Sequence, residues 1–287
     1  MEEGPKRDRH LSGVCLVIAS TPIYSLSGVL TKTIAADAWT IMCWRGLVGG
    51  LLIAAYLAWS GRNKPSGDSF RLGWQGWLLA SVGSLASLAF ILAFKMTYVA
   101  NVAVIYATTP FIAGGLGWLF VRERFRLRTV IAAVVSLIGV AIVVSGGLGS
   151  VNIVGDMVAL AMAFGTALYM TLIRVFRRSP VVWAGGVSAI QLFAVSWLIV
   201  DPLTITQHDA FLVLLFGISF AIALVLWTEG TKLIPAAEAG LLGTAEMPFA
   251  VLLAGLLLGE VPPIASFVGG SFVLAAVFTH ATLDARD

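Results

Sequence analysis

Charged side chains are scarce in this sequence. They make up 11% of its 287 residues, while apolar residues make up 59%. A soluble globular protein has roughly 25% charged and 45–50% apolar residues. The shortage of charge argues against a water-soluble fold and predicts a membrane protein. The net charge of +3 does not indicate a nucleic-acid partner, because the basic residues lie at the ends of apolar runs and form no patch with interleaved aromatic residues.

Cysteine and histidine are also rare. Cys15 and Cys43 both fall inside apolar runs, where cysteine behaves as a small hydrophobic residue, and the sequence has no CxxC motif. His10, His208 and His280 lie far apart in the sequence, near the ends of apolar runs. The sequence therefore predicts no disulfide, no metal site and no redox cofactor.

The apolar runs lack the groups from which membrane enzymes build a catalytic site, namely paired aspartates, clustered histidines or a nucleophile with a base. Four aspartates lie instead at the ends of runs: Asp37, Asp156, Asp201 and Asp209. We therefore expect no enzyme, although a membrane-embedded enzyme remains an alternative from another class. A channel would need a ring of similar polar residues, which the sequence does not supply.

What the sequence does contain is a series of ten apolar runs between charged or turn-forming breaks. A run of about 20 residues is long enough to cross the roughly 30 Å hydrocarbon core of a bilayer. The expected fold class is an all-α polytopic membrane protein with ten transmembrane helices. The first run is longer than the 7–15 apolar residues of a signal peptide, so we expect it to be retained. The runs cover about residues 11–32, 38–60, 74–95, 100–121, 128–146, 153–173, 181–200, 210–230, 235–258 and 263–281.

Two of these runs belong to stretches that resemble each other, residues 95–123 and 232–260. Each stretch opens on a lysine, passes through small residues, contains a proline (Pro110 or Pro248) and closes on a glutamate. The lysines and the glutamates are 137 residues apart and the prolines 138. Similarity at half the chain length predicts an internal duplication. A weaker correspondence pairs two glycines, Gly13 and Gly155, at a spacing of 142.

The basic residues predict the orientation of the chain. Ten spans with cytoplasmic ends place fifteen lysines and arginines inside and two outside, a strong positive-inside asymmetry. The loop after the first similar stretch reads RERFRLR and the loop after the second reads GEVPP, so the two loops are expected on opposite sides. Five spans per half is an odd number, which also inverts the second half. We therefore predict two inverted five-helix repeats, residues 1–146 and 147–287.

Glu246 is the most informative polar residue, because it lies about halfway along the ninth run. A carboxylate at that depth is costly unless it is paired, solvated or protonated, and it is a functional candidate for that reason. It could carry a proton or meet a substrate ammonium; a carboxyl that only bridges two helices is the alternative. Arg45, about a third of the way into the second run, either snorkels outward or holds a substrate carboxylate.

Other polar and aromatic residues near the centres of the runs complete the candidate site. Aromatic rings with polar tips suit a planar, amphipathic solute. The two prolines remove a backbone donor within a helix, which bends it and frees a carbonyl for water or ligand. Packing between helices is the alternative role for each of these residues. Besides Glu246, the predicted substrate-binding residues are Tyr24, Trp44, Ser84, Tyr106, Thr109, Pro110, Tyr169, Gln191 and Pro248.

The two similar stretches also carry a resemblance to a known superfamily. Small residues, a proline and then Glu123 or Glu260 are followed in each half by a last run rich in Gly and Ala. In this the chain resembles the drug/metabolite transporter superfamily, and within it the EamA-type transporters built from two inverted five-helix repeats. The tyrosines within the runs and Trp44 resemble the YddG-type exporters of aromatic amino acids. Glu246 departs from the repeat, because the first half has Thr109 beside its proline.

The resemblance implies a secondary transporter that exports small metabolites, with aromatic amino acids as the favoured class, by alternating access at a central mid-membrane site. A multidrug or cation exporter of the same fold is the alternative. The expected partners are an amino acid-like small molecule, membrane lipids and protons, with the chain a monomer or a weak dimer. The expected location is the inner (plasma) membrane, with both termini cytoplasmic.

Overall fold

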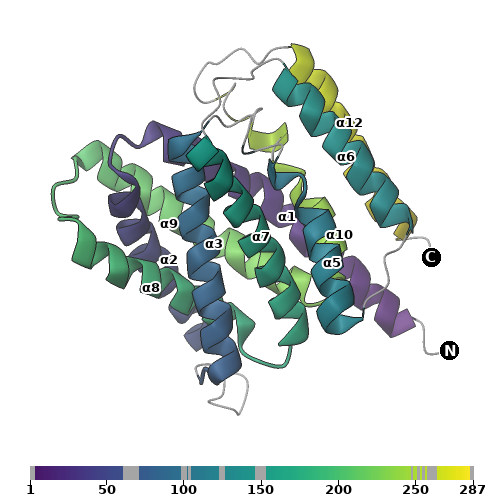
Figure 1. Ribbon diagram of the computed structural model, residues 1–287. Helices are drawn as coiled ribbons and strands as arrows, with labels where there is room; N and C mark the ends of the chain where they lie inside the picture. Colours follow the sequence, from purple (N-terminus) through teal and green to yellow (C-terminus); the bar gives the residue numbers. More distant parts are fainter. Residues whose placement is uncertain are drawn as a thin grey trace.

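The computed structural model is built from α-helices throughout the part of the chain that it describes (Figure 1). The described residues are 4–60, 71–97, 102, 105–122, 127–145, 153–246, 248–250, 253, 256 and 264–284. The helices of the first half are α1 (Gly4–Thr33), α2 (Ala38–Ser60), α3 (Trp74–Met96), α5 (Thr109–Val121) and α6 (Leu127–Ser145). Those of the second half are α7 (Ile153–Val175), α8 (Val181–Ile199), α9 (Gln207–Thr231), α10 (Ala236–Gly243) and α12 (Ile264–Asp284).

Within the described residues, six helices are long and apolar enough to cross a membrane: α1, α2, α3, α7, α8 and α9. Three shorter apolar helical segments accompany them, Thr109–Val121, Thr129–Gly139 and Val268–Val277. Their outer surface is apolar, with Leu198 87% and Ile264 82% exposed. A surface of this kind suits lipid better than water. The chain thus has the helices of a multi-pass membrane protein, while the count of ten spans remains a prediction.

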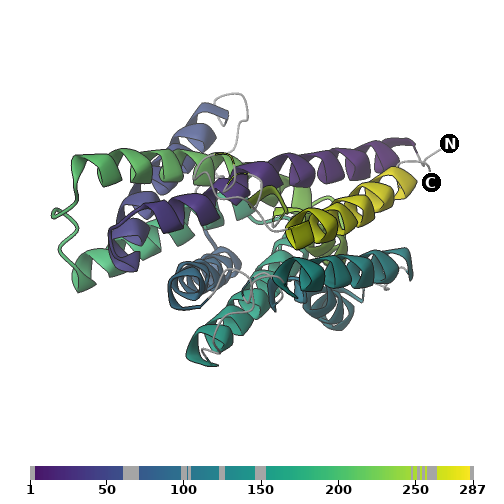
Figure 2. The ribbon, with the colours of Figure 1, turned by 90° about the horizontal axis from the view of Figure 1, so that it is seen from above.

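The helices of the two halves pack against each other in matching pairs. α1 packs against α9 and α3 against α7, while α2 packs against α8 and α5 contacts α10. α6 and α12 lie side by side at one edge of the molecule (Figures 1 and 2). The first helix of each half packs against the third helix of the other half, so that the pair α1 and α9 is equivalent to the pair α7 and α3. The packing is therefore similar when seen from either half.

Two glycines show this similarity at the level of single residues. A Cβ atom on Gly13 of α1 would lie 2.8 Å from the Ile234 side chain, and one on Gly155 of α7 would lie 2.7 Å from Thr97. The two glycines are 142 residues apart and their two neighbours 137. Each half therefore inserts the start of its first helix against the same part of the other half.

Glycine also sets the distance between helices elsewhere. Gly46 of α2 lies so close to the backbone carbonyl of Ala189 on α8 that a Cβ atom would collide with it. A Cβ on Gly139 of α6 would lie 2.7 Å from the backbone oxygen of Gly269 on α12. Small residues let helix backbones approach closely in membranes. Gly46 and Gly139 therefore allow close contacts between helices of the two halves.

The fourth and ninth predicted spans are interrupted, which the sequence analysis did not predict. α5 begins at Thr109, after a turn at residues 107–108, and α10 ends at Gly243, before a turn at residues 244–245. Pro110 therefore lies in the first turn of α5, where its missing N–H costs no helical hydrogen bond. The expectation that this proline removes a backbone donor in the middle of a helix was wrong, because Pro110 lies at the start of α5. The two turns are 137 residues apart.

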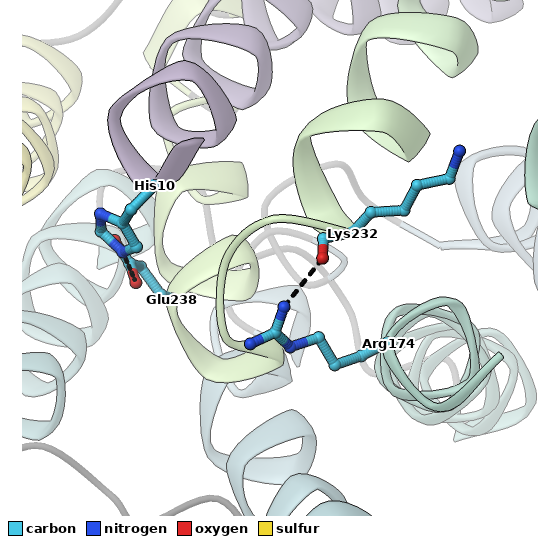
Figure 3. Close-up of polar contacts among 4 residues, drawn as sticks. All are labelled: His10, Arg174, Lys232 and Glu238. Atoms are coloured by element: carbon cyan, nitrogen blue, oxygen red, sulfur yellow. Dashed lines mark hydrogen bonds and ion pairs between the residues drawn. The ribbon is translucent and has the colours of Figure 1, made fainter. Parts of the chain in front are cut away.

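Polar contacts tie helix ends together at one side of the bundle (Figure 3). The His10 Nε2 atom lies 3.0 Å from the Glu238 Oε2 atom, which joins α1 to α10. Arg174 at the end of α7 donates from Nη1 to the backbone carbonyl of Lys232, which caps α9, at 2.8 Å. Glu229 pairs with the Lys232 ammonium at 2.8 Å. The ten-span topology places all these residues on the cytoplasmic side.

A second set of contacts joins segments that the same topology places outside. Thr97 after α3 donates to the Asp156 carboxylate of α7 at 2.9 Å. The Trp44 indole of α2 donates to the backbone carbonyl of Pro202, after α8, at 2.8 Å. The contact of Asp156 and that of Arg174 lie at opposite ends of α7. The centre of the bundle between them holds the candidate site.

Candidate functional site

A cavity of about 120 Å³ lies among the helices of both halves. Its wall comes from α1, α2, α3, α7, α8 and α9, and from residues beside the two interrupted spans. Most of the lining is apolar or aromatic, as is usual for small-molecule sites. The lining residues are Tyr24, Ser27, Arg45, Gly83, Ala86, Ser87, Phe90, Tyr106, Thr166, Tyr169, Ser188, Phe220, Leu224, Trp227 and Glu246.

Four of the ten predicted site residues line this cavity: Tyr24, Tyr106, Tyr169 and Glu246. Tyr24 lies on α1 and Tyr169 on α7, while Tyr106 and Glu246 flank the interruptions near α5 and α10. The ring of Tyr24 meets Trp227 of α9 edge to face, with ring centroids 6.1 Å apart and an angle of 87°. Three tyrosines and a tryptophan therefore give the cavity an aromatic wall.

Glu246 follows the turn that ends α10 and is 8% exposed. Ser25 of α1 donates to its backbone carbonyl at 2.7 Å, which fixes the main chain beside the cavity. Within the described part of the chain, the carboxylate itself has no hydrogen bond and no ion pair. The alternative role, a carboxyl group that bridges two helices, therefore has no bonding partner for the carboxylate among the described residues. The acidic group is left facing the space where a solute would bind.

Arg45 lies on another wall of the same cavity and is 3% exposed. Its Nη2 group donates to the Ser87 hydroxyl of α3 at 2.6 Å. Its guanidinium carbon lies 4.4 Å from the ring centroid of Phe220 and 5.2 Å from that of Phe216, both on α9. Of the two roles left open for Arg45, outward snorkelling is wrong, because the side chain is buried among helices.

Arg45 and Glu246 are the two charged residues among those that line the cavity. They are not joined to each other in an ion pair, and within the described residues neither forms an ion pair with another side chain, although Arg45 donates a hydrogen bond to the Ser87 hydroxyl. Buried charges in proteins are usually paired, because leaving water is costly. A cavity that holds an unpaired cation and an unpaired anion is therefore suited to a solute that supplies the missing partners.

Two predicted residues, Ser84 and Gln191, lie just behind the cavity wall and contact each other. The Ser84 hydroxyl of α3 lies 2.6 Å from Gln191 Oε1 and 3.3 Å from the Ser188 hydroxyl, both on α8. Ser188 itself lines the cavity. The structure therefore places Ser84 and Gln191 in a polar contact between α3 and α8 that positions Ser188.

Trp44 lies farther away, at the end of α2 that bonds to Pro202. Its ring also meets Trp197 of α8 edge to face, at 6.5 Å between centroids. Trp44 does not line the cavity. Its contacts anchor α2 to α8 at the predicted external face.

The remaining three predicted residues pack beside the interruptions and do not line the cavity. Thr109 is fully buried. A Cβ on Gly240 would lie 3.1 Å from Pro110, and one on Gly270 would lie 3.2 Å from Pro248. Both prolines thus contact a glycine on a neighbouring helix, which sets how closely that helix approaches.

Sequence reasoning missed most of the cavity wall, because the spacing of a helix face does not show which face turns inward when nearly every face is apolar. On α3 the lining residues are Gly83, Ala86, Ser87 and Phe90, and on α9 they are Phe220, Leu224 and Trp227. Both sets follow the i, i+3 or i+4, i+7 spacing of one helix face. Ser27 and Thr166 carried no separate signal. Among the described residues, no three His, Cys, Asp or Glu side chains lie close enough to hold a metal ion.

Comparison with known proteins places this cavity in a family. The EamA-like transporter family matches the chain twice, at residues 11–145 and 153–281. The chain belongs to this family. The first match covers the described helices α1 to α6, and the second covers α7 to α12. In this EamA-like chain the cavity is therefore lined by both matched segments.

A known transporter is also similar to this chain in sequence. The uncharacterized transporter YetK of Bacillus subtilis (strain 168) is 25% identical over 193 residues, which cover 61% of this chain and 57% of YetK. The match thus spans little more than half the length of that protein. A solved structure described as "Crystal structure of protein" has 20% sequence identity and a TM-score of 0.81, covering 96% of this chain and 98% of its own. It shows that another protein has the same fold as this chain.

Proposed function

We propose that this EamA-like chain is a secondary transporter that exports small metabolites, specifically aromatic amino acids, by alternating access at the cavity. The observation that carries the proposal is the aromatic cavity between the two matched segments, with Glu246 unpaired in its wall. Transporter sites lie near the membrane midplane at the interface of repeats and are formed in part by discontinuous helices. The interruptions beside Tyr106 and Glu246 have this character.

The proposal includes two inverted repeats, residues 1–146 and 147–287, with both termini cytoplasmic in the inner (plasma) membrane. The matching helix pairs and the equivalent contacts of Gly13 and Gly155 support the repeat. The contacts of Figure 3 and those of Thr97 and Trp44 support the topology, since each joins segments assigned to one side. An inverted pair of halves can exchange conformations and open one site alternately to either side.

The size of the cavity favours a ring-sized solute. With about 120 Å³ the cavity is somewhat smaller than a dry cavity of about 150 Å³ that binds benzene in another protein, so its volume compares with that of a single ring. The aromatic wall supplies edge-to-face partners for a planar ring. Glu246 supplies a negative charge that can accept hydrogen bonds from an ammonium. A proton taken up by the same carboxyl group would be a direct way to couple transport to a pH gradient.

A multidrug or cation exporter is the second candidate. Tyrosine and tryptophan rings around a carboxylate also suit a quaternary cation, and the cavity contains both. The presence of the Arg45 cation in the same cavity argues against a solute that carries positive charge alone.

Resistance of cells to toxic solutes tests the proposal. Cells overproducing the protein should tolerate 4-fluorophenylalanine better than cells that produce the Glu246→Gln variant at the same level. Tolerance should not extend to tetraphenylphosphonium. Resistance to that cation without resistance to the amino acid analogue would replace the amino acid proposal with the multidrug one.

A further inference from the structure

Arg45 is a buried cation whose contacts within the described residues satisfy only part of its hydrogen-bonding capacity. Its guanidinium has five N–H donors, yet one hydrogen bond, to Ser87, is made within the described residues. Its Nε atom is buried and has no partner there. The faces of Phe216 and Phe220 compensate part of the charge, but a cation–π contact is weaker than a charge-assisted hydrogen bond to an anion.

We propose that Arg45 is the anion-binding residue of the cavity and binds the carboxylate of the transported solute. The inference rests on the proposed transport function and names the chemical class that the cavity selects, a zwitterion or other carboxylic acid. The guanidinium fork matches the planar carboxylate, which can accept two parallel hydrogen bonds. Glu246 on another wall is then available to the ammonium of the same solute.

The arrangement around Arg45 positions it for this role. Ser87 is one of four lining residues on a single face of α3, and its hydroxyl holds Nη2 at 2.6 Å. Phe220 lines the cavity and lies under the guanidinium at 4.4 Å. Side chains from α2, α3 and α9 thus fix the guanidinium plane before a solute arrives. Preorganisation of this kind reduces the ordering cost of binding.

The pairing of charges also predicts selectivity. A solute with both a carboxylate and an ammonium neutralises Arg45 and Glu246 at once. A solute with one of the two charges leaves the other residue buried and unpaired, which costs affinity. Zwitterions should therefore be preferred over amines and over simple acids.

The test compares protein variants with ligand variants, so that it isolates one contact. Binding of L-phenylalanine and of L-phenylalaninamide, which lacks the carboxylate, is measured on the purified parent protein and on Arg45→Gln and Arg45→Lys variants. We expect the parent to bind the acid at least tenfold more tightly than the amide. This preference should vanish in Arg45→Gln and be reduced in Arg45→Lys, which keeps the charge but not the fork.

Arg71→Gln is the matched control, because Arg71 is exposed at the start of the segment that leads into α3. It should keep the parent preference. If Arg45→Gln fails to fold, the comparison of acid and amide on the parent and on Arg45→Lys still decides the matter. An equal preference for the acid in the parent and in the Arg45 variants overturns the role of Arg45, while the transport proposal stands.

Two further ligands separate the inference from the transport proposal. Binding of 3-phenylpropionate, which lacks the ammonium, as tightly as L-phenylalanine and with dependence on Arg45 would support the anion site but replace the amino acid proposal with one for simple acids. Binding of tetraphenylphosphonium by the parent, without binding of any carboxylate, would overturn both the anion site and the amino acid proposal.

Discussion

Replacing Glu246 by glutamine is the most informative single perturbation of the cavity. The side chain keeps its size, and the Ser25 hydroxyl still donates to the backbone carbonyl at this position. What changes is the charge and the ability to take up a proton. We expect the Glu246→Gln protein to fold and insert like the parent, but to transport aromatic amino acids at least tenfold more slowly or without pH dependence.

The magnitude follows from the surroundings of the carboxylate. Glu246 is 8% exposed and has no hydrogen bond from its carboxylate to another described residue. A substrate ammonium bound there would make a charge-assisted hydrogen bond worth about 1.5–3 kcal/mol. Losing it corresponds to a reduction of about tenfold to over a hundredfold, since about 1.4 kcal/mol is a factor of ten.

The assay is transport into proteoliposomes from about pH 5 to pH 8, with Glu229→Gln as the control. Glu229 is a partly exposed carboxylate that pairs with Lys232 at 2.8 Å and does not line the cavity. Its substitution should leave the rate unchanged, because exposed ion pairs contribute little. Parent rates for Glu246→Gln at every pH would refute the binding and coupling roles and return Glu246 to a structural one.

Three further predictions concern topology, packing and capping. In a cysteine-free background, a cysteine at position 127 should react with an impermeant thiol reagent only from the cytoplasmic side and one at position 264 only from outside; labelling of both from one side contradicts the inverted repeat. Gly46→Ala should lower stability by about 1–3 kcal/mol through collision with α8. Gly115→Ala is the control and should not lower stability in this way, because no atom lies within 4 Å of the new Cβ. Equal melting temperatures for the two variants would contradict the packing account. Partial burial raises the pKa of the Asp37 carboxyl group, but hydrogen bonds from the first turn of α2 lower it by more, so that the pKa lies below its usual value. Asp37→Ala should therefore cost about 1 kcal/mol at neutral pH, and the difference in melting temperature should shrink as the pH falls through that lowered pKa; a difference that persists in acid contradicts the capping account.

The sequence predicted the helices well because membrane spans have a strong signal. Long apolar runs bounded by charge leave few alternatives to a helix. The bounds of α2, α3 and α7 agree with the predicted runs to within two residues. α1 begins at Gly4, several residues before its apolar run, because a helix can extend beyond the membrane through polar residues.

The interruptions at residues 107–108 and 244–245 were harder to predict. Proline can either bend a helix or begin one, and the local sequence of Pro110 does not distinguish the two. The decision depends on tertiary contacts, such as the approach of Gly240 to Pro110. A single sequence carries no direct record of such contacts.

The candidate site was predicted in part for the same reason. Tyr24, Tyr106, Tyr169 and Glu246 were found because aromatic or acidic residues near span centres are unusual enough to stand out. Arg45 was noticed without a decision between its two roles, because its burial depends on how α2 rotates against α3 and α9. Rotation of a helix about its axis is set by its neighbours, and the hydrophobic pattern does not fix it when nearly every face is apolar.

The most direct test of the account is transport of labelled amino acids by the purified protein in liposomes, with and without a pH gradient. The account predicts that L-phenylalanine, L-tyrosine and L-tryptophan cross the membrane faster than in protein-free liposomes, and that excess unlabelled phenylalanine on the opposite side accelerates the exchange. It also predicts that Arg45→Gln and Glu246→Gln reduce this movement while Glu229→Gln does not. Liposomes that carry no amino acid with the folded parent protein, but do carry a quaternary cation, would contradict the account.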